Sequence, residues 1–295
     1  MLRSAVRLSW GPVSYLEWTP VRADDAATVV LLHGGGVDSA SLSWAGVGPR
    51  LAAAECRVLA PDHPGYGQSP PAPWPATQDR LVGYVNEFVD AVVFGRYAIG
   101  GLSLGGGMTI GHVLERPENV TGAMLLGSYG IMPRLSDGPL CRVRQALTWA
   151  MSRTGLLTAV TKWSGRNRQV MTRVIPALIR DPAQRTPELL DEILAAARSE
   201  HAFDAFAQWQ RDQFRWDRLT TDYRARLTSF PRPALIVHGD RDTSVPIAAA
   251  RAAADLIPDV RFEVVAGAAH WVQRDRPEVV IAAMLDFLDT VNAAT

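Results

Sequence analysis

The sequence has little cysteine, almost no lysine and no long apolar run. Cys56 and Cys141 are the only cysteines among 295 residues and lie far apart, which excludes a disulfide framework and cysteine-based metal spacing and favours a reducing cytoplasm. No apolar stretch approaches the length of a membrane-spanning helix, and the N-terminus lacks the features of a signal peptide. Lys162 is the only lysine and alanine is abundant, which indicates a bacterial chain from a GC-rich genome.

An excess of charge of either sign is also missing. Thirty basic residues balance thirty acidic ones, so no nucleic acid and no membrane is expected as a partner. The remaining composition, with 47% hydrophobic and 20% charged residues, is ordinary for a globular enzyme. The length allows one large core with a sizeable insertion.

The most informative stretch is residues 97–108. A short apolar run leads into Gly101-Leu102-Ser103-Leu104-Gly105, and a helix-compatible apolar stretch follows without a spacer. This context predicts a strand, a sharp turn and a helix, with the Ser103 hydroxyl exposed on the turn. A Gly-x-Ser-x-Gly string arises by chance in roughly one chain in ten of this length, so the surrounding pattern carries the prediction. Ser103 is the candidate nucleophile.

Strands and helices alternate in the first 129 residues. Two alternating segments, 4–9 and 13–18, flank Gly11-Pro12 and predict an antiparallel hairpin. The near-continuous apolar run at 28–33 is typical of a strand buried on both faces of a mostly parallel sheet. Further predicted strands are 57–60, 97–100 and 122–126, and the predicted helices are 41–54, 77–92 and one ending near Arg116.

The alternation stops after the strand at 122–126. Residues 130–230 contain three or four helical patterns and no convincing buried strand, which predicts an α-helical cap inserted into the core. Strand patterns return at 233–238 and 261–265, with helices at 248–256 and 277–291. We therefore expect an α/β core at 1–129 and 231–295, and a helical cap at 130–230.

A serine nucleophile needs a base and an acid that orients it. Asp240 and Asp242 both follow the strand at 233–238, and either is a candidate acid. His270 lies in a loop after the last predicted strand and is the candidate base, because the order Ser, Asp, His is the one expected after such a turn. The other five histidines are interpreted as structural: His33, which would brace the glycine loop, His63, His112, His201 and His238.

The oxyanion formed by attack on a carbonyl group needs backbone donors. One is expected from Leu104, directly after the serine. The other is expected from the glycine loop that follows the strand at 28–33, with Gly35 preferred and Gly36 second. A phosphate-binding loop is the rival interpretation, but no Gly-Lys-Ser/Thr follows, and the spacing does not fit a dinucleotide fingerprint.

Five segments together resemble the landmarks of the α/β-hydrolase superfamily, in order and at ordinary spacing: 33–36, 62–69, 101–106, 239–246 and 267–271. The resemblance implies a mostly parallel eight-stranded sheet flanked by helices, with an inserted α-helical cap. It also implies that Asp242, three residues before Val245-Pro246, is the acid, and that Asp62 is structural.

Within that superfamily the chain looks like the capped branch of carboxylesterases, lactonases and meta-cleavage-product hydrolases. The resemblance of 270–273 to the last group implies carbon–carbon bond hydrolysis, but Leu102 replaces that group's usual asparagine, and Glu192 falls where its cap arginine is expected. We therefore expect a serine hydrolase of a small-molecule ester or lactone, acting through an acyl-enzyme. A carbon–carbon hydrolase is the alternative, and so is a cofactor-free cyclase, a lyase or a ligand-binding member of the fold.

The cap is expected to roof Ser103. Tryptophans at four positions are candidates for substrate binding: Trp149, Trp163, Trp209 and Trp271. For the three in the cap, packing in the cap's own core is the alternative. The segment from Arg134 to Arg185 carries ten basic and two acidic residues, which we interpret as a solvated surface, with attraction of an acidic substrate or partner as the alternative. No cofactor or metal is expected, and the chain is predicted to be a monomer or homodimer.

Overall fold

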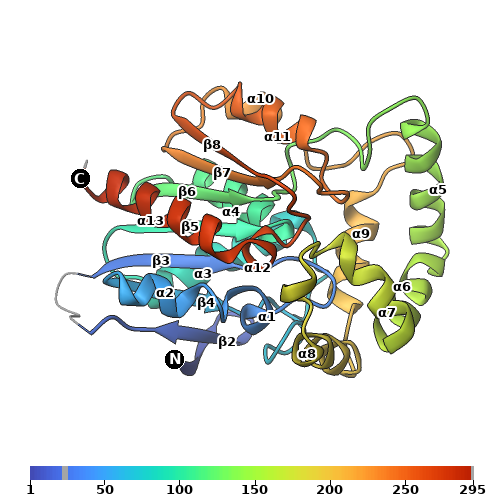
Figure 1. Ribbon diagram of the computed structural model, residues 1–295, viewed down its shortest axis with the longest axis horizontal. Coiled ribbons are helices and arrows are strands. Elements are labelled where there is room, and N and C mark those ends of the chain that lie inside the picture. Colours follow the sequence, from blue (N-terminus) through green and yellow to red (C-terminus); the bar gives the residue numbers. More distant parts are fainter. Residues whose placement is uncertain (22–25, 294–295) are drawn as a thin grey trace.

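A computed structural model describes residues 1–21 and 26–293, which form an eight-stranded sheet with helices on both faces (Figure 1). The strand order is β1-β2-β4-β3-β5-β6-β7-β8. The strands are β1 (Leu2–Leu8), β2 (Gly11–Trp18), β3 (Ala27–Leu32), β4 (Cys56–Pro61), β5 (Tyr97–Leu102), β6 (Val120–Leu126), β7 (Ala234–Gly239) and β8 (Val260–Val265). β2 is antiparallel to β1 and β4, and all other pairs are parallel. The predicted sheet, including its N-terminal hairpin, is confirmed.

The central strands are buried on both faces because their side chains alternate between two separate cores. In β3, Val30 and Leu32 belong to one core, while Val29 and Leu31 belong to the other. This period of two explains why the strand is apolar throughout: neither of its faces meets water.

Helices cover both cores. One face carries α3 (Gln78–Val92), α4 (Leu104–Glu115) and α11 (Ile247–Ala254); the other carries α1 (Ala40–Trp44), α2 (Gly48–Ala53) and α13 (Pro277–Ala293). The single helix expected at 41–54 is wrong, because the chain breaks between α1 and α2 and restarts with Pro49 in the first turn of α2. Proline is compatible with the start of a helix and not with its interior.

The segment between β6 and β7 is helical; most of it lies beyond the carboxyl ends of the strands, and its last helix lies back beside the sheet (Figure 1). It contains α5 (Cys141–Arg153), α6 (Leu156–Arg166), α7 (Arg168–Val174), α8 (Pro187–Ala197), α9 (Asp204–Gln213) and α10 (Arg224–Leu227), with 3-10 turns at Ile175–Ala177 and Pro182–Gln184. These are more helices than the three or four expected. Leu219, Leu227 and Phe230 pack into the sheet's own core, so the last part of this segment returns to the sheet before residue 230.

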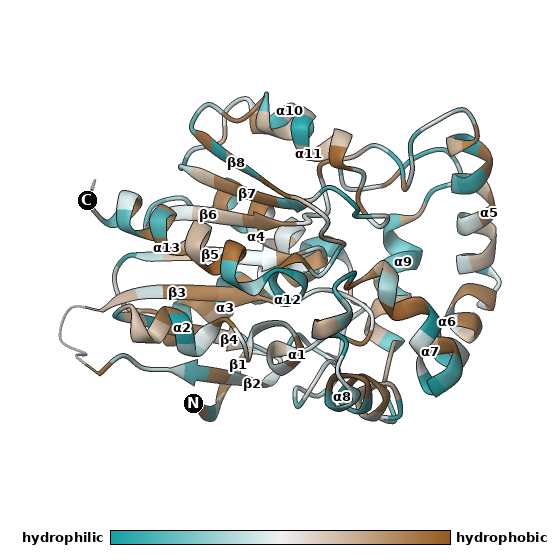
Figure 2. Ribbon diagram, viewed as in Figure 1, coloured by the Kyte–Doolittle hydropathy of each residue, from teal (hydrophilic) through white to brown (hydrophobic). Residues whose placement is uncertain are grey.

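The most hydrophobic residues are concentrated in the central strands of the sheet (Figure 2). Within the described ranges, no helix is both long enough and apolar enough to cross a bilayer.

Candidate active site

Ser103 lies on a strained turn between β5 and α4. Its backbone has φ 53° and ψ −113°, a region that a residue with a side chain rarely adopts. The turn is held by the Ser103 amide, which donates to Leu126 O at 2.9 Å, and by the Ser103 carbonyl, which accepts from Gly107 N at 3.0 Å and Tyr129 N at 2.9 Å. Adjacent backbone makes glycine necessary at position 105, because a Cβ there would overlap the carbonyl oxygens of Leu32 and His33.

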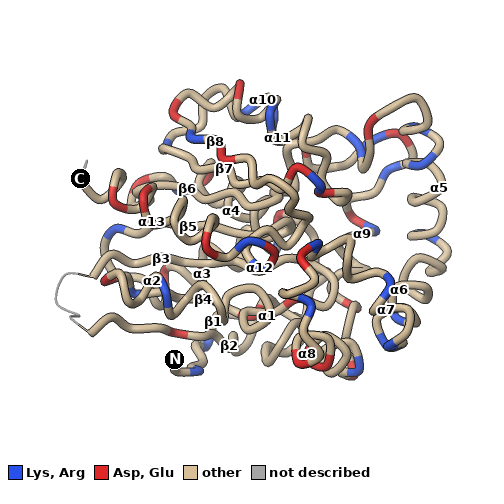
Figure 3. Tube along the Cα trace, in the orientation of Figure 1, with Lys and Arg blue, Asp and Glu red and all other residues tan. Residues whose placement is uncertain are grey.

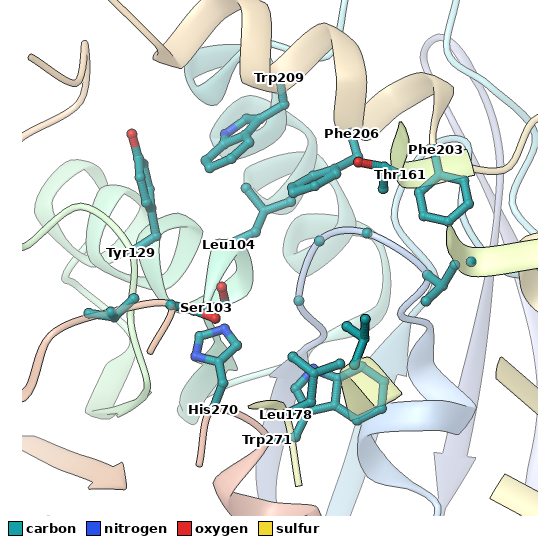
Figure 4. A pocket seen from close by; sticks show the side chains of 18 of the residues that line it. Ser103, Leu104, Tyr129, Thr161, Leu178, Phe203, Phe206, Trp209, His270 and Trp271 are labelled. Carbon is teal, nitrogen blue, oxygen red and sulfur yellow. The ribbon is translucent and has the colours of Figure 1, made fainter. Parts of the chain in front are cut away.

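His270 and Asp242 meet beside Ser103. His270 Nδ1 lies 2.7 Å from Asp242 Oδ2, and both side chains are almost wholly buried. With Nδ1 used in this way, the second ring nitrogen faces the Ser103 hydroxyl (Figure 4). Asp242 Oδ1 also accepts from the amides of Ser244 and Val245, at 2.7 and 3.0 Å. The structure therefore brings together the three residues proposed as nucleophile, base and acid.

The electrostatics of this group favour an ionised Asp242. Burial raises the pKa of its carboxyl, but the neighbouring His270 and His238 and the hydrogen bonds outweigh this, so the pKa lies below its usual value. His238 Nε2 donates to Val245 O at 2.9 Å and lies 3.6 Å from Asp242 Oδ2. Burial lowers the pKa of His238, which keeps that ring neutral beside the acid.

Asp240, the rival acid, points elsewhere. Its Oδ1 accepts from Gly267 N at 2.7 Å, so it braces the loop that leads to His270.

Asp275 was missed by sequence reasoning, although its buried carboxylate supports the same loop. It accepts from the amides of Ala269, Arg180 and Asp181 at 2.6, 2.9 and 2.8 Å, and so joins the histidine loop to the cap. No local pattern marks such a role, since it depends on distant backbone.

The glycine loop after β3 lies against Ser103. Gly35, Gly36 and Leu104 all line the same cavity as the serine. Gly34 also lines it, but its amide donates to Asp38 Oδ2 at 2.6 Å. Gly35 and Gly36 thus remain the loop's candidate oxyanion donors. A Cβ at Gly35 would overlap the Phe206 ring of α9, so glycine also allows the cap to approach closely.

His33 braces this loop, as predicted. Its Nε2 accepts from His63 N at 3.0 Å, its Nδ1 lies 2.7 Å from Gly34 O, and the His33 and His63 rings stack at 3.8 Å. Burial lowers the pKa of His33 to about 3, which keeps it neutral. Asp62, also read as structural, is fully buried and pairs with Arg3 at 2.6 Å.

A cavity of about 430 Å³ lies between Ser103 and the cap. Figure 4 shows Ser103 and His270 at its floor, with Phe206 and Trp209 of α9 on the cap side. Apart from the triad and loop residues, the lining is mainly apolar: Val37, Tyr129, Met132, Leu135, Val160, Met171, Val174, Leu178, Phe203, Phe206, Trp209, Phe214, Val245 and Trp271. No arginine, lysine, aspartate or glutamate is among its described lining residues.

The four candidate tryptophans divide into two pairs. Trp209 and Trp271 line the cavity, whereas Trp149 and Trp163 do not, so their assignment to the pocket was wrong. No described residue of α5, which carries Trp149, reaches the cavity. Trp163 is 60% exposed and lies outside the cavity, whereas Thr161 and Ser164 of the same helix line it, as does the exposed Val160.

The side chains of Glu192 and Leu102 do not line the cavity either. Glu192 Oε1 accepts from the Ser41 hydroxyl at 2.9 Å, and the Leu102 side chain is buried in the core on the α13 face of the sheet. Among the residues that the structure describes, no group of three or more His, Cys, Asp or Glu could hold a metal ion.

A family model described as alpha/beta hydrolase fold matches residues 27–277. The chain belongs to this family. It is 29% identical over 278 residues, covering 92% of this chain and 88% of the relative, to the 2-hydroxy-6-oxo-6-(2'-aminophenyl)hexa-2,4-dienoic acid hydrolase of Metapseudomonas resinovorans. It is 25% identical over 269 residues, covering 90% and 88%, to the 2-hydroxymuconate semialdehyde hydrolase of Pseudomonas sp. (strain CF600).

Solved α/β-hydrolase structures share the fold. The meta-cleavage product hydrolase from Pseudomonas fluorescens IP01 superimposes with a TM-score of 0.79 at 20% identity, over 97% of each chain. The α/β-hydrolase fold and the likeness to meta-cleavage-product hydrolases, both implied by the sequence motifs, are confirmed. The chain is a hydrolase of this family, with a small molecule as the class of substrate.

Proposed function

We propose that this hydrolase uses Ser103 to attack a carbonyl group of a small, mainly apolar substrate. The observation that carries the proposal is the 2.7 Å contact between His270 and Asp242 beside a serine on a strained turn, all at the floor of one cavity. Each residue has the neighbour that its chemistry requires: the nucleophile faces a base, and a buried carboxylate orients the base.

In the proposed reaction, His270 takes the Ser103 proton as Oγ attacks the carbonyl carbon. Asp242, ionised because its pKa lies below its usual value, stabilises the imidazolium. The amides of Leu104 and of Gly35 or Gly36 stabilise the oxyanion. With an ester, His270 then protonates the leaving alcohol. With a dienoate, the dienol first shifts to its keto form, its hydroxyl proton moving to the carbon beside the attacked carbonyl, so that the electrons of the broken carbon–carbon bond leave as a dienolate that takes up the proton from His270. In both cases a water molecule, activated by the same base, releases the acyl group from Ser103.

Carbon–carbon bond hydrolysis is the reaction that the relatives support, ahead of the ester or lactone hydrolysis expected from the sequence. Two relatives that match about nine-tenths of this chain are named as hydrolases of 2-hydroxy-6-oxo-dienoic acids or of a muconate semialdehyde. Those substrates carry a carbonyl group that a serine can attack, and the intact Ser, His and Asp support hydrolysis over a non-hydrolytic use of the fold.

Ester or lactone hydrolysis remains the second candidate because of the cavity lining. The dienoic acids named for the relatives carry a carboxylate, whereas no described lining residue is an arginine or lysine. Burying a carboxylate without a cation or several hydrogen bonds is costly. An uncharged acyl group meets no such penalty here.

A matched panel separates the two candidates. Purified protein and Ser103→Ala are compared on nitrophenyl esters of short and medium chain, on a lactone, on 2-hydroxy-6-oxo-6-phenylhexa-2,4-dienoate and on its methyl ester. Carbon–carbon cleavage predicts loss of the dienol absorbance with the two dienoates, and the cavity lining predicts a kcat/KM at least tenfold higher for the methyl ester than for the acid. Efficient turnover of esters or lactone alone would select the second candidate.

Two results would contradict the proposal as a whole. One is equal turnover by the protein and by Ser103→Ala. The other is failure of a fluorophosphonate probe to label Ser103 in folded protein that hydrolyses any member of the panel.

A further inference from the structure

Exposed apolar side chains are concentrated on three successive cap helices. Of thirteen large apolar side chains that are exposed in the described residues, seven lie between positions 140 and 174. We call this set the outer cap surface: Leu140, Val143, Leu147, Leu156, Val160, Trp163 and Val174. Trp163 is 60% exposed, and Leu140 and Leu147 are each 59% exposed. Single exposed apolar residues need no explanation, but a concentration of this kind marks an interaction site.

The spacing of these residues follows the helices. Val143 and Leu147 lie one turn apart on α5, with Leu140 immediately before it, and Leu156, Val160 and Trp163 follow the same periodicity on α6. The helices α5, α6 and α7 form the outer edge of the molecule, on the side away from the sheet (Figure 1). The outer cap surface is therefore carried by amphipathic helices, and its apolar side chains are left exposed in the described structure.

The same helices are strongly basic. Residues 138–180 contain eight arginine or lysine residues and no aspartate or glutamate, and basic positions recur along these helices in Figure 3. Lys162 and Arg168 pair with Asp204 and Asp191. The exposed Arg142, Arg144, Arg153 and Arg173 have no ion-pair partner within the described residues.

Such a surface could bind a second copy of this chain or a lipid surface, and the charges on it favour one of the two. A second copy placed symmetrically on it would bring one set of unpaired arginines against another, with no aspartate or glutamate between residues 138 and 180 to balance them, which is unfavourable. An anionic lipid surface offers negative charge for the arginines and an apolar interior for the leucine, valine and tryptophan side chains.

We propose that α5, α6 and α7 dock on an anionic lipid surface through the outer cap surface. Val160 and Val174 belong to this surface and also line the cavity above Ser103. Docking therefore places the cap-side wall of the cavity at the lipid boundary, where an apolar substrate is concentrated. This goes beyond the proposed function and replaces the expectation, drawn from the neutral net charge, that no membrane is a partner.

The test is co-sedimentation of the full chain with vesicles of phosphatidylcholine alone or mixed with phosphatidylglycerol. The expected result is binding to the mixed vesicles only, weakened by salt. Leu147→Ser combined with Trp163→Ser should abolish it, whereas Phe94→Ser, at an exposed apolar residue just before β5, should not. Arg142→Gln, Arg144→Gln and Arg153→Gln together should weaken it roughly a hundredfold, about fivefold for each arginine, and Arg96→Gln should leave it unchanged.

Ser103→Ala should bind vesicles as the unaltered chain does, so docking and catalysis fail separately. Absence of binding to the mixed vesicles would overturn the proposal, as would equal binding by the Leu147/Trp163 variant. A concentration-dependent dimer in analytical ultracentrifugation that the same variant converts to a monomer, without vesicle binding by either, would assign the surface to a second copy.

Discussion

Asp38 Oδ2 lies 2.6 Å from the backbone nitrogen of Gly34, in the loop beside the candidate nucleophile. The same oxygen accepts from the Ser43 hydroxyl at 2.6 Å, and Oδ1 accepts from Ser39 N at 2.8 Å. The buried carboxylate therefore occupies the first amide of the glycine loop and ties that loop to α1. This leaves the next two amides, of Gly35 and Gly36, for a developing oxyanion.

Asp38 is expected to make stability depend on pH. Burial raises its pKa from 3.8 to about 6. The folded state then holds a proton that the unfolded chain releases, so the free energy of unfolding falls as pH rises from about 4 to 6, by up to about 3 kcal/mol. Asp38→Asn removes this contribution. Urea unfolding at pH 5 and pH 8 should show the stability of the unaltered chain, relative to the variant, falling at the higher pH. A pH-independent difference would contradict the assignment.

Asp38 is also expected to position the glycine loop for catalysis. Asp38→Ala frees Gly34 N and loosens the amides that follow it, so kcat should fall about tenfold to a hundredfold, less than or equal to the loss of one oxyanion donor. KM should change little, because the side chain does not reach the cavity lining. Steady-state kinetics on the best substrate of the panel measures both constants, and a rise in KM at unchanged kcat would count against this role.

The two neighbouring aspartates should behave very differently when replaced. Asp242→Asn removes the negative charge that stabilises the His270 imidazolium and lets an amide N–H face Nδ1, which favours the wrong tautomer of the ring, so kcat should fall by about four orders of magnitude. Asp240→Asn retains an oxygen that can accept from Gly267 N and should cost less than about tenfold. Both variants should unfold near the temperature of the unaltered chain. A larger loss of kcat in Asp240→Asn would reverse the assignment of the acid.

Local sequence pattern predicted the sheet and the residues around Ser103 because each leaves a recognisable pattern in neighbouring residues. Strand β3 is apolar along both faces, and glycine at position 105 is required by contact with the carbonyls of Leu32 and His33. The order of Ser103, Asp242 and His270 follows from the order of the strands that carry them. Each strand, turn and loop of this group can be read from the residues that flank it, even where, as at Gly105, the contact that requires the residue is distant in the sequence.

The cavity lining could not be predicted in the same way because it depends on how the cap helices are rotated. Trp209 and Trp163 are the same residue type in similar helical patterns, yet only Trp209 faces Ser103's cavity. Asp275 joins the histidine loop to the backbone amides of Arg180 and Asp181, which lie almost a hundred residues away in the chain. Asp38 has a usable local signal, since it is an acidic residue that lies two residues after the glycine loop and two residues before α1.

Gly105, beside the strained turn at Ser103, should tolerate no side chain. Gly105→Ala puts a methyl group onto the backbone of Leu32 and His33, which cannot move without disrupting β3, so the loss of unfolding free energy should exceed about 3 kcal/mol. Gly83→Ala is the matched control, since a Cβ there meets nothing within 4 Å and the residue lies inside α3. That change should raise stability by about 0.5 to 1 kcal/mol. Urea unfolding measures both, and comparable effects would contradict the packing described for the turn.

Trp209 should set the length of substrate that the cavity accepts. Its ring stacks on Phe206 at 5.6 Å and meets Tyr129 edge-on at 4.7 Å, while its Nε1 donates to Gln78 Oε1 at 2.9 Å, which fixes its position. Trp209→Ala enlarges the cavity so that a short acyl chain no longer fills it. Across a nitrophenyl ester series, the ratio of kcat/KM for long over short chains should rise at least tenfold. Trp163→Ala, the control, should leave this ratio unchanged with dissolved substrates, because that ring lies outside the cavity. A shift of similar size in both variants would mean that the cap acts through its stability and not through the shape of this wall.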